Sequence, residues 1–350
     1  MNHLLALFTA YLIAAATMPS VIAVARTRRI LDFPDPRKIH DSAVPLMGGA
    51  GIFAALILSL TFFGAIFFEP RFLFIVTSLL VMFFIGLLDD LRPMKPTTKL
   101  FGQCCAAFLV VAFADIRLRD WYGLFGWQQI SYGASLLLTA LLIVFTVNAF
   151  NFMDGMDGFA GSFAVLVSLL QGVLFYLGGQ PFFAMLSLIL AGSVSGFLRF
   201  NRFPARIFMG DTGSMVVGWV LAISSVQLTT LRFTSVTEFP QEASVSLAVC
   251  LMVIPVMDAL RVVLLRLING RSPFRPDNQH FHHDMLRLGW TPQRSIIVLC
   301  FFQLFILWLT FSLIRLPVFQ LLFIQVFTAL LLLSLPAFIE SYRKLTHQQG

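Results

Sequence analysis

Long runs of apolar residues, separated by short polar segments, dominate the pattern of the chain. A run of about 20 apolar residues crosses a bilayer as a helix, and most of the runs in this sequence approach or reach that length. We predict eleven spans, a count that changes by one if the short fourth run, which contains Gly102 and Gln103, does not cross. The spans cover residues 3–24, 46–68, 71–88, 99–114, 132–150, 158–177, 181–198, 213–231, 244–268, 294–313 and 317–340. This pattern predicts an all-α polytopic membrane protein.

The basic residues predict the orientation of these spans, because Lys and Arg accumulate in short loops on the cytoplasmic side. With eleven spans, the odd-numbered loops and the C-terminal tail share one side. That side holds 19 of the 24 Lys and Arg residues when Arg261 and Arg266 are counted with it. The N-terminus is therefore expected outside and the C-terminus in the cytoplasm.

Composition agrees with a membrane protein and excludes a nucleic-acid-binding one. The chain is 58% hydrophobic and 12% charged, far from soluble globular usage. Its net charge of +7 reflects the topology signal, since no basic soluble domain is present to bind nucleic acid. No linker or low-complexity tract divides the sequence, so residues 1–350 are expected to form one domain. The first apolar run exceeds the usual length of a signal-peptide core and has no basic segment before it, so we interpret it as a span.

Acidic residues gather at the ends of the apolar runs. Five of them fall on the predicted cytoplasmic face: Asp89, Asp90, Asp154, Asp157 and Asp211. Carboxylates at the edge of the hydrocarbon region are usually functional. Their oxygen atoms are the ligands that hard cations prefer, which predicts a site for a divalent cation and a phosphorylated substrate.

The segment NAFNFMDGMDG carries a polar residue at every third position: Asn148, Asn151, Asp154 and Asp157. Positions three apart on a helix are neighbours that drift by about 60° per step. The first three are therefore expected to line one wall of a cavity, with Asp157 turned towards an adjacent surface. Gly155 would allow a close approach. The alternative is an Asn/Asp helix cap followed by turn glycines.

The other two acidic motifs allow similar alternatives. Asp89 and Asp90 are adjacent, so on a helix they point about 100° apart and are expected to differ in role. One would bind a metal or hold the other, and the second would accept or orient a proton; capping of the polar loop that follows is the alternative. Asp211, between Gly210 and Gly213, is either a metal ligand or an ordinary N-cap.

Three histidines occupy four positions in DNQHFHHDM. If this segment is helical, His280 and His283 share a side and His282 faces elsewhere. No HExxH motif or nearby cysteine supports zinc. Donation to phosphate oxygens is the better interpretation, because Arg271, Arg275 and Arg287 add positive charge nearby. A solvated loop is the alternative.

Asp258 is an acid inside the ninth predicted span, three residues after Pro255. Proline breaks or kinks a helix. The pattern suits a broken helix that opens a groove for a lipid, and equally a structural partner of Asp258 in Arg261 or Arg266.

Four strings, in this order among these spans, resemble the polyprenyl-phosphate N-acetylhexosamine-1-phosphate transferases: DDLRPMKPTTKL, NAFNFMDGMDG, RIFMGDTGS and SPFRPDNQHFHH. The early strings RKIH and PLMGG also match, so the resemblance covers roughly residues 30 to 290. The HFHH string is similar to the branch that begins O-antigen, enterobacterial common antigen or teichoic-acid linkage synthesis.

The resemblance implies that undecaprenyl phosphate attacks the sugar-linked phosphorus of a UDP-N-acetylhexosamine and releases UMP. UDP-N-acetylglucosamine is the expected donor. It further implies Mg²⁺, with Mn²⁺ as a substitute, and a multi-pass protein of the bacterial cytoplasmic (inner) membrane with its site on the cytoplasmic face. Membrane lipid is a further expected partner, and no nucleic-acid partner is expected. A homodimer is compatible with the family.

Roles are transferred from the family residue by residue. Asp89 matches the base or nucleophile-orienting residue, Asp90 its support with a link to the metal, and Asp211 the magnesium ligand. The expected substrate-binding residues are Lys99, Asn148, Asn151, Asp154, Asp157 and Asn201, with Asp157 as the uracil contact. The histidines His280, His282 and His283 match a catalytic motif that holds phosphate or sugar.

Other functions deserve comparison. An ion-coupled transporter also carries intramembrane acids, but most acids here cluster at one face and no inverted repeat is visible. A metal-dependent hydrolase of polyprenyl diphosphates is the nearer alternative. The same transferase chemistry with a 6-deoxy-N-acetylhexosamine donor also remains open, since the donor is expected to be selected by the loop 269–293.

Overall fold

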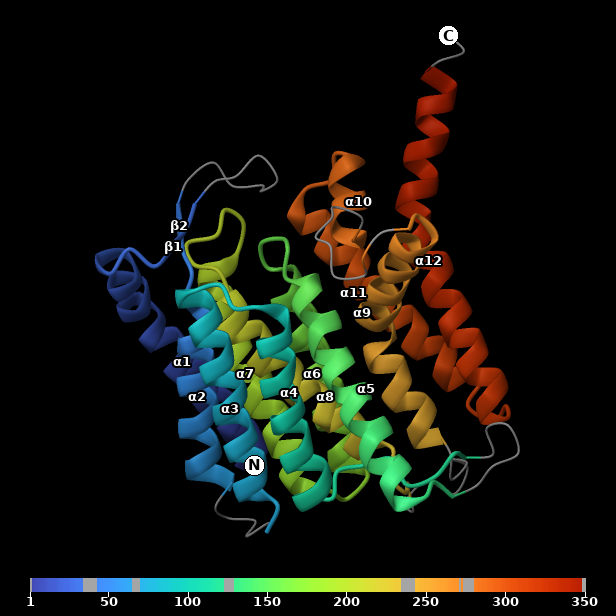
Figure 1. Ribbon diagram of the computed structural model, residues 1–350, viewed down its shortest axis with the longest axis horizontal. Coiled ribbons are helices and arrows are strands. Elements are labelled where there is room, and N and C mark those ends of the chain that lie inside the picture. Colours follow the sequence, from blue (N-terminus) through green and yellow to red (C-terminus); the bar gives the residue numbers. More distant parts are fainter. Residues whose placement is uncertain are drawn as a thin grey trace.

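The computed structural model describes residues 2–33, 43–64, 70–122, 129–233, 243–270, 272 and 280–347. Within these residues the chain is almost entirely helical, and the all-α polytopic fold predicted from the sequence is confirmed (Figure 1). The elements are α1 Asn2–Thr27, β1 Leu31–Asp32, β2 Val44–Pro45, α2 Gly48–Gly64, α3 Phe72–Leu91, α4 Pro96–Phe108, a π-helical turn Leu109–Phe113, α5 Tyr132–Met153, α6 Phe159–Leu177, α7 Pro181–Asn201, α8 Gly210–Leu228, α9 Ala243–Ile268, α10 Phe281–Arg287, α11 Pro292–Ser312 and α12 Val318–His347.

Each of the eleven predicted spans corresponds to one long helix. Among the described helices, nine are long and apolar enough to cross a membrane. The exceptions are α2, which has 17 residues, and α8, which begins with the polar sequence GDTGS. The N-terminus and the C-terminus lie at opposite ends of the bundle (Figure 1), as an odd number of crossings requires.

Local sequence explains where several helices begin. Proline lies in the first turn of α4, α7 and α11, where the missing N–H removes no helical hydrogen bond. The side chain of Thr291 caps α11 by accepting a hydrogen bond from the backbone N–H of Arg294 at 3.4 Å. These prolines therefore mark the starts of three helices in the bundle.

Helix α8 is the centre of the bundle and packs against α2, α3, α5, α6, α7 and α9. Almost every residue from Thr212 to Leu228 is buried. Trp219 is fully buried, and its indole N–H donates to Ser78 of α3 at 3.0 Å. A helix enclosed by others tolerates small and polar residues, because it packs against protein rather than lipid. The polar start of α8 is therefore held in a fixed position.

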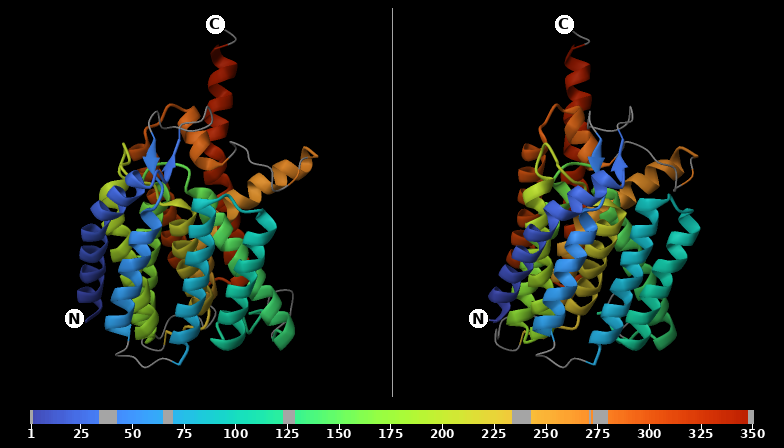
Figure 2. Two further views of the ribbon diagram at one scale, coloured as in Figure 1. Left: turned by 60° about the vertical axis from the view of Figure 1, so that its left-hand side comes forward. Right: turned by 90° about the vertical axis from the view of Figure 1, so that its left-hand side faces the viewer.

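Helix α9 crosses the bundle and then bends away from it. Figure 2 shows its C-terminal part projecting sideways from the other helices. Pro255 is the proline inside this helix, and proline removes a backbone hydrogen bond and bends the helix. The kink predicted near Asp258 is thus present.

A short backbone ladder supports the start of α8. The strands β1 and β2 pair antiparallel, and the carbonyl of Pro45 at the end of β2 accepts from the N–H of Phe208 at 2.8 Å. The N–H groups of Gly48 and Gly49 then donate to the carbonyls of Phe208 and Met209, both at 2.9 Å. Backbone hydrogen bonds from the segment PLMGG therefore hold the segment FMGD in place.

Candidate active site

The acidic motifs meet at one end of the bundle. Asp89 and Asp90 lie in the last turn of α3, Asp154 directly after α5, and Asp211 in the first turn of α8. Helices α3, α5 and α8 pack together, and β1, β2 and α10 lie at this same end of the molecule (Figure 1). Segments more than 100 residues apart in the sequence thus build one polar surface.

Lys99 of α4 joins two of these acids. Its Nζ donates to Asp89 Oδ2 at 3.0 Å and to Asp211 Oδ1 at 2.9 Å. Asp211 Oδ1 also accepts from the amide of Asn151 at 2.5 Å, and the same amide donates to Ser214 at 2.6 Å. The backbone N–H of Met94 holds the second oxygen of Asp89 at 2.6 Å. A positive charge therefore lies between the carboxylates of Asp89 and Asp211.

Asp90 caps the central helix. Its Oδ1 accepts from the N–H of Asp211 at 2.8 Å, and its Oδ2 accepts from the N–H and the hydroxyl of Thr212 at 2.9 and 2.5 Å. These N–H groups belong to the first turn of α8, which has no helical acceptors for them. Gly210 has a φ of +70°, and a Cβ there would lie 2.7 Å from Asp90. Asp90 therefore supports the start of α8, and its expected link to a metal stays a prediction.

Asp154 lies among like charges. Burial, together with the nearby carboxylates of Asp211, Asp90 and Asp157, raises its pKa to about 7. Because like charges disfavour ionisation of one another, this environment favours the binding of a cation. The acids predicted from the sequence are therefore close enough to interact.

The remaining residues of the NAFNFMDGMDG pattern separate into different environments. Asn148 exchanges hydrogen bonds with Gln103 of α4, at 2.7 and 3.3 Å, rather than sharing a wall with Asn151. The reason is that α5 packs against α4 as well as α8. Asp157 turns to an adjacent surface, as predicted, and accepts from the N–H of Ala205 at 2.9 Å.

Asn201 is buried and bound to the backbone at both ends of its amide. It accepts from the N–H of Gly158 and donates to the carbonyl of Ile207, each at 2.9 Å. It therefore ties the turn after Asp157 to the segment that leads to α8. Its expected substrate contact stays a prediction.

The histidines form a second group on α10 and the residue before it. His280 and His282 are buried, their rings are nearly parallel at 6.0 Å between centroids, and His283 lies 4.2 Å from His282. The prediction that His282 faces away from its neighbours was wrong. The helix begins only at Phe281 and His280 is extended, so helical spacing does not relate His280 to the other two.

Asp258 orients this group from the bent helix α9. Its Oδ2 lies 2.9 Å from His280 Nδ1, and its Oδ1 accepts from the N–H of Phe281 at 3.0 Å. The alternative of a structural partner in Arg261 is confirmed at 3.2 Å, and Arg261 also contacts Asp284 at 3.0 Å. A carboxylate that accepts from one ring nitrogen fixes the tautomer and leaves the other nitrogen to face a ligand.

Contacts with the α5–α6 turn join the two groups. The ring of His280 lies 5.5 Å from that of Phe152, and the ring of His282 lies 6.2 Å from that of Phe159. Burial, with neighbouring His283 and His280, lowers the pKa of His282 to about 3. His282 is therefore neutral near pH 7, with one ring nitrogen available as a donor.

The donor set of the carboxylate group suits a hard cation. The ammonium of Lys99 already lies between two carboxylates, and Asp154 is close to both Asp90 and Asp211. In the described residues no three His, Cys, Asp or Glu side chains form a ready ligand set. Mg²⁺ commonly uses one or two carboxylates, with substrate phosphates and water as further ligands, so the residues fit such an ion.

Some predictions concern residues that the structure does not describe. The string RKIH, together with Arg271 and Arg275, lies outside the described ranges.

Two contacts were not predicted from the sequence. Thr212 received no role, although a hydroxyl residue directly after Asp211 is common at the start of a helix. The pairing of Gln103 with Asn148 was likewise not predicted, despite the polar residue standing inside an apolar run.

Comparisons with known proteins identify the family to which the chain is similar. Residues 72–229 match the family model described as glycosyl transferase family 4. The chain is 31% identical over 294 residues to the decaprenyl-phosphate N-acetylglucosaminephosphotransferase of Mycobacterium tuberculosis (strain ATCC 25618 / H37Rv), covering 76% of this chain and 71% of that protein. It is 29% identical to the probable undecaprenyl-phosphate N-acetylglucosaminyl 1-phosphate transferase of Bacillus subtilis (strain 168), covering 85% and 82%. The undecaprenyl-phosphate alpha-N-acetylglucosaminyl 1-phosphate transferase of Escherichia coli (strain K12) is 27% identical, covering 79% and 74%.

Proposed function

Because the chain belongs to glycosyl transferase family 4, with the polyprenyl-phosphate N-acetylglucosamine phosphotransferases, we propose that it transfers N-acetylglucosamine 1-phosphate from UDP-N-acetylglucosamine to undecaprenyl phosphate. An oxygen of the lipid phosphate bonds to the sugar-linked phosphorus. The bond from that phosphorus to the bridging oxygen breaks, and UMP leaves with the electron pair. The contact of Lys99 with both Asp89 and Asp211 is the observation that carries this proposal.

The residues have distinct positions for this reaction. Asp89 faces Lys99 and is placed to orient the attacking phosphate or accept its proton. Asn151 fixes the carboxylate of Asp211, and Asp90 fixes the backbone that carries it. Lys99 and the histidines provide donors for phosphate oxygens. Positioning of this kind supplies much of the catalysis in phosphoryl transfer.

Mg²⁺ is the cofactor that the site would take. Asp211 would hold it, with Asp89 or Asp154 adjacent. When bound, the ion neutralises charge on the diphosphate oxygens. Lys99 would lie next to the ion, since its ammonium contacts Asp211 Oδ1 at 2.9 Å.

The chain is a multi-pass membrane protein, and we place its site on the cytoplasmic face of the bacterial inner membrane. The distribution of Lys and Arg supports this orientation. UDP-sugars are soluble in the cytoplasm, and the attacking phosphate lies at the membrane surface. The polar end of the bundle, which carries Asp89, Asp154 and Asp211, is where the two substrates would meet.

The test is transfer of radiolabel from UDP-N-acetylglucosamine to organic-extractable lipid by the purified protein with undecaprenyl phosphate. We expect a product that requires Mg²⁺ and forms with UMP release. Asp211→Asn should lower the rate roughly a hundred-fold or more, since a metal ion contributes several kcal/mol to such reactions. Asp120→Asn, in the loop between α4 and α5, is the matched control and should retain activity.

The same assay separates the alternatives. Product from a 6-deoxy-N-acetylhexosamine donor alone would keep the mechanism and replace the sugar. Release of inorganic phosphate from polyprenyl diphosphate, without nucleotide, would indicate a hydrolase instead. No lipid product from any nucleotide sugar would contradict the transferase.

A further inference from the structure

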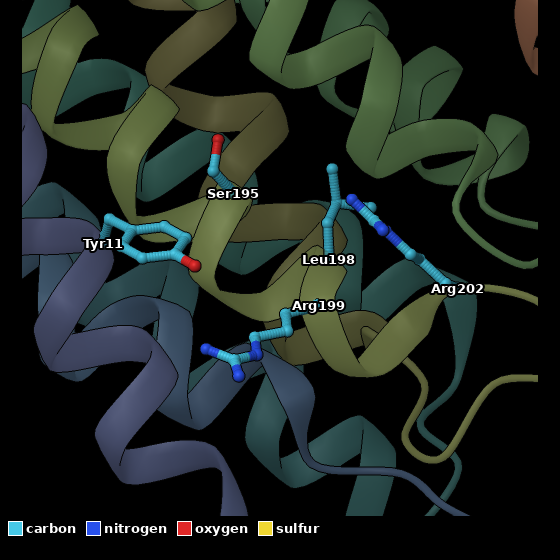
Figure 3. A pocket seen from close by; sticks show the side chains of 5 residues that line it. All are labelled: Tyr11, Ser195, Leu198, Arg199 and Arg202. Atoms are coloured by element: carbon cyan, nitrogen blue, oxygen red, sulfur yellow. The ribbon is translucent and has the colours of Figure 1, made fainter.

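A cavity of about 390 Å³ lies between α1 and α7, apart from the carboxylate group. It is lined by Tyr11, Ser195, Leu198, Arg199 and Arg202 (Figure 3). Helix α1 lies at one edge of the bundle and α9 at the other (Figure 1). The cavity therefore belongs to a different face of the protein from the histidine group.

The cavity has polar and charged side chains near the end of α7. Arg199 lies in the last turn of α7 and Arg202 directly follows its last residue, so both are at the end of the bundle that carries Asp154 and Asp211. Ser195 is one turn earlier, and Figure 3 shows the hydroxyl of Tyr11 directed into the space between α1 and α7. The two guanidinium groups thus belong to the end of α7, and the hydroxyl of Ser195 lies one turn further into the bundle.

Below the cavity, α1 presents an apolar outer face. Leu4, Leu5, Phe8 and Leu12 are all about half exposed or more, as expected of side chains that contact lipid tails. The protein therefore offers cations, then hydroxyls, then apolar side chains. This order complements the phosphate, ester groups and acyl chains of a phospholipid.

Neither arginine has a carboxylate partner in the part of the chain that the structure describes. This differs from Arg261 and Arg287, which form ion pairs with Asp284. Arg199 and Arg202 are exposed, and guanidinium groups bind phosphate oxygens in bidentate geometry. Basic pockets between helices on the cytoplasmic side also attract anionic headgroups.

We propose that this cavity binds an anionic membrane phospholipid. Arg199 and Arg202 hold its phosphate, Tyr11 and Ser195 donate to its ester oxygens, and its acyl chains follow the outer face of α1. Phosphatidylglycerol is the anionic phospholipid that the experiment below uses as a probe. The site is separate from the place where the reacting lipid phosphate meets Asp89.

The cavity also contacts the support of the active-site turn. Leu198 packs against Gly161 and Gly158, and Asn201, next to Arg202, binds the N–H of Gly158. The N–H of Ala205 holds Asp157. A lipid that fixes the end of α7 is therefore expected to stabilise the turn that carries Asp157.

The experiment uses the full-length protein, without substrates, in nanodiscs of phosphatidylcholine with increasing phosphatidylglycerol. Native mass spectrometry counts retained lipids, and thermal unfolding reports stabilisation. We expect retention of phosphatidylglycerol that weakens about 5-fold in Arg199→Gln and about 30-fold in the double variant with Arg202→Gln, from the usual contribution of a basic residue near anionic lipid. Arg294→Gln, an exposed arginine on α11, is the matched control and should behave as the original protein.

Three results would overturn the proposal: equal retention by the double variant, equal retention of phosphatidylcholine, or stabilisation by inorganic phosphate alone to the same extent. The last would indicate a simple anion site. Replacement of both arginines by lysine keeps the charge and should keep most of the retention. If the glutamine variants do not fold, Ser195→Phe fills the cavity without changing charge and should also reduce retention; unchanged retention in that variant would contradict the site.

Discussion

The imidazole of His282 lies directly against Gly155, so close that a Cβ on the glycine would overlap with its Nε2. This contact joins the turn after α5, which carries Asp154, to the histidines before and within α10. The absence of a side chain at Gly155 is what permits the approach. The two groups of the candidate site are thereby held in one arrangement.

Gly155→Ala is expected to reduce transferase activity at least ten-fold while the protein remains folded. The added methyl must displace His282 or move the turn that holds Asp154, and small displacements of catalytic groups are costly. Initial rates and circular dichroism measure the two effects. Gly133→Ala is the matched control, because a Cβ at Gly133 meets nothing within 4 Å. Equal rates for the two variants would show that the contact has no functional role.

Asp90→Ala is expected to lower the thermal stability of the protein as well as its activity. Asp90 accepts three hydrogen bonds from Asp211 and Thr212, and loss of a helix cap costs about 0.5–2 kcal/mol. Asp211→Asn should lower activity with little change in stability in the absence of Mg²⁺. Thermal unfolding of both variants separates support from metal binding. A melting temperature unchanged in Asp90→Ala would contradict the capping role.

The sequence predicted the helices and the acidic surface because both follow from local pattern. Apolar runs define the spans, and Asp89, Asp154 and Asp211 stand at the ends of runs on one predicted side. Because successive loops alternate between the two sides of the membrane, these acids all fall on the same side. Both features are local and do not depend on which helices are neighbours.

The partners of individual residues could not be predicted in this way. Asp90 binds the start of α8, 121 residues later, and Asp258 binds His280, 22 residues later. Asn148 faces Gln103 because α5 packs against α4 as well as α8. These contacts depend on the order of helices around α8, which residue spacing does not specify.

Lys99→Met is expected to reduce activity and to increase the stabilisation that Mg²⁺ gives. Without the ammonium, Asp89 and Asp211 repel each other in the metal-free protein, and the more negative site attracts a divalent cation more strongly. Thermal unfolding with and without Mg²⁺ measures the second effect. Lys95→Met is the matched control, since Lys95 is exposed at the start of the same helix. A Mg²⁺ response equal to that of the original protein would indicate that Lys99 does not neighbour the ion.

His282 is expected to make stability fall as the pH drops below about 6.5. Its pKa is about 3 in the folded protein, because it is buried and has His283 and His280 as neighbours, with Asp258 acting in the opposite direction. An unfolded histidine has a pKa of about 6.5. The unfolded state therefore binds more protons between these values, and stability is lost as pH falls through 6.5.

Between pH 7 and pH 5 the loss from His282 should be about 2 kcal/mol. His282→Gln should remove this part of the pH dependence, which chemical or thermal unfolding of the substrate-free protein at several pH values measures. His3→Gln, near the N-terminus, should keep the original slope. If His282→Gln keeps the slope as well, the ring takes up a proton equally readily in the folded and the unfolded state, which would contradict the low pKa of His282.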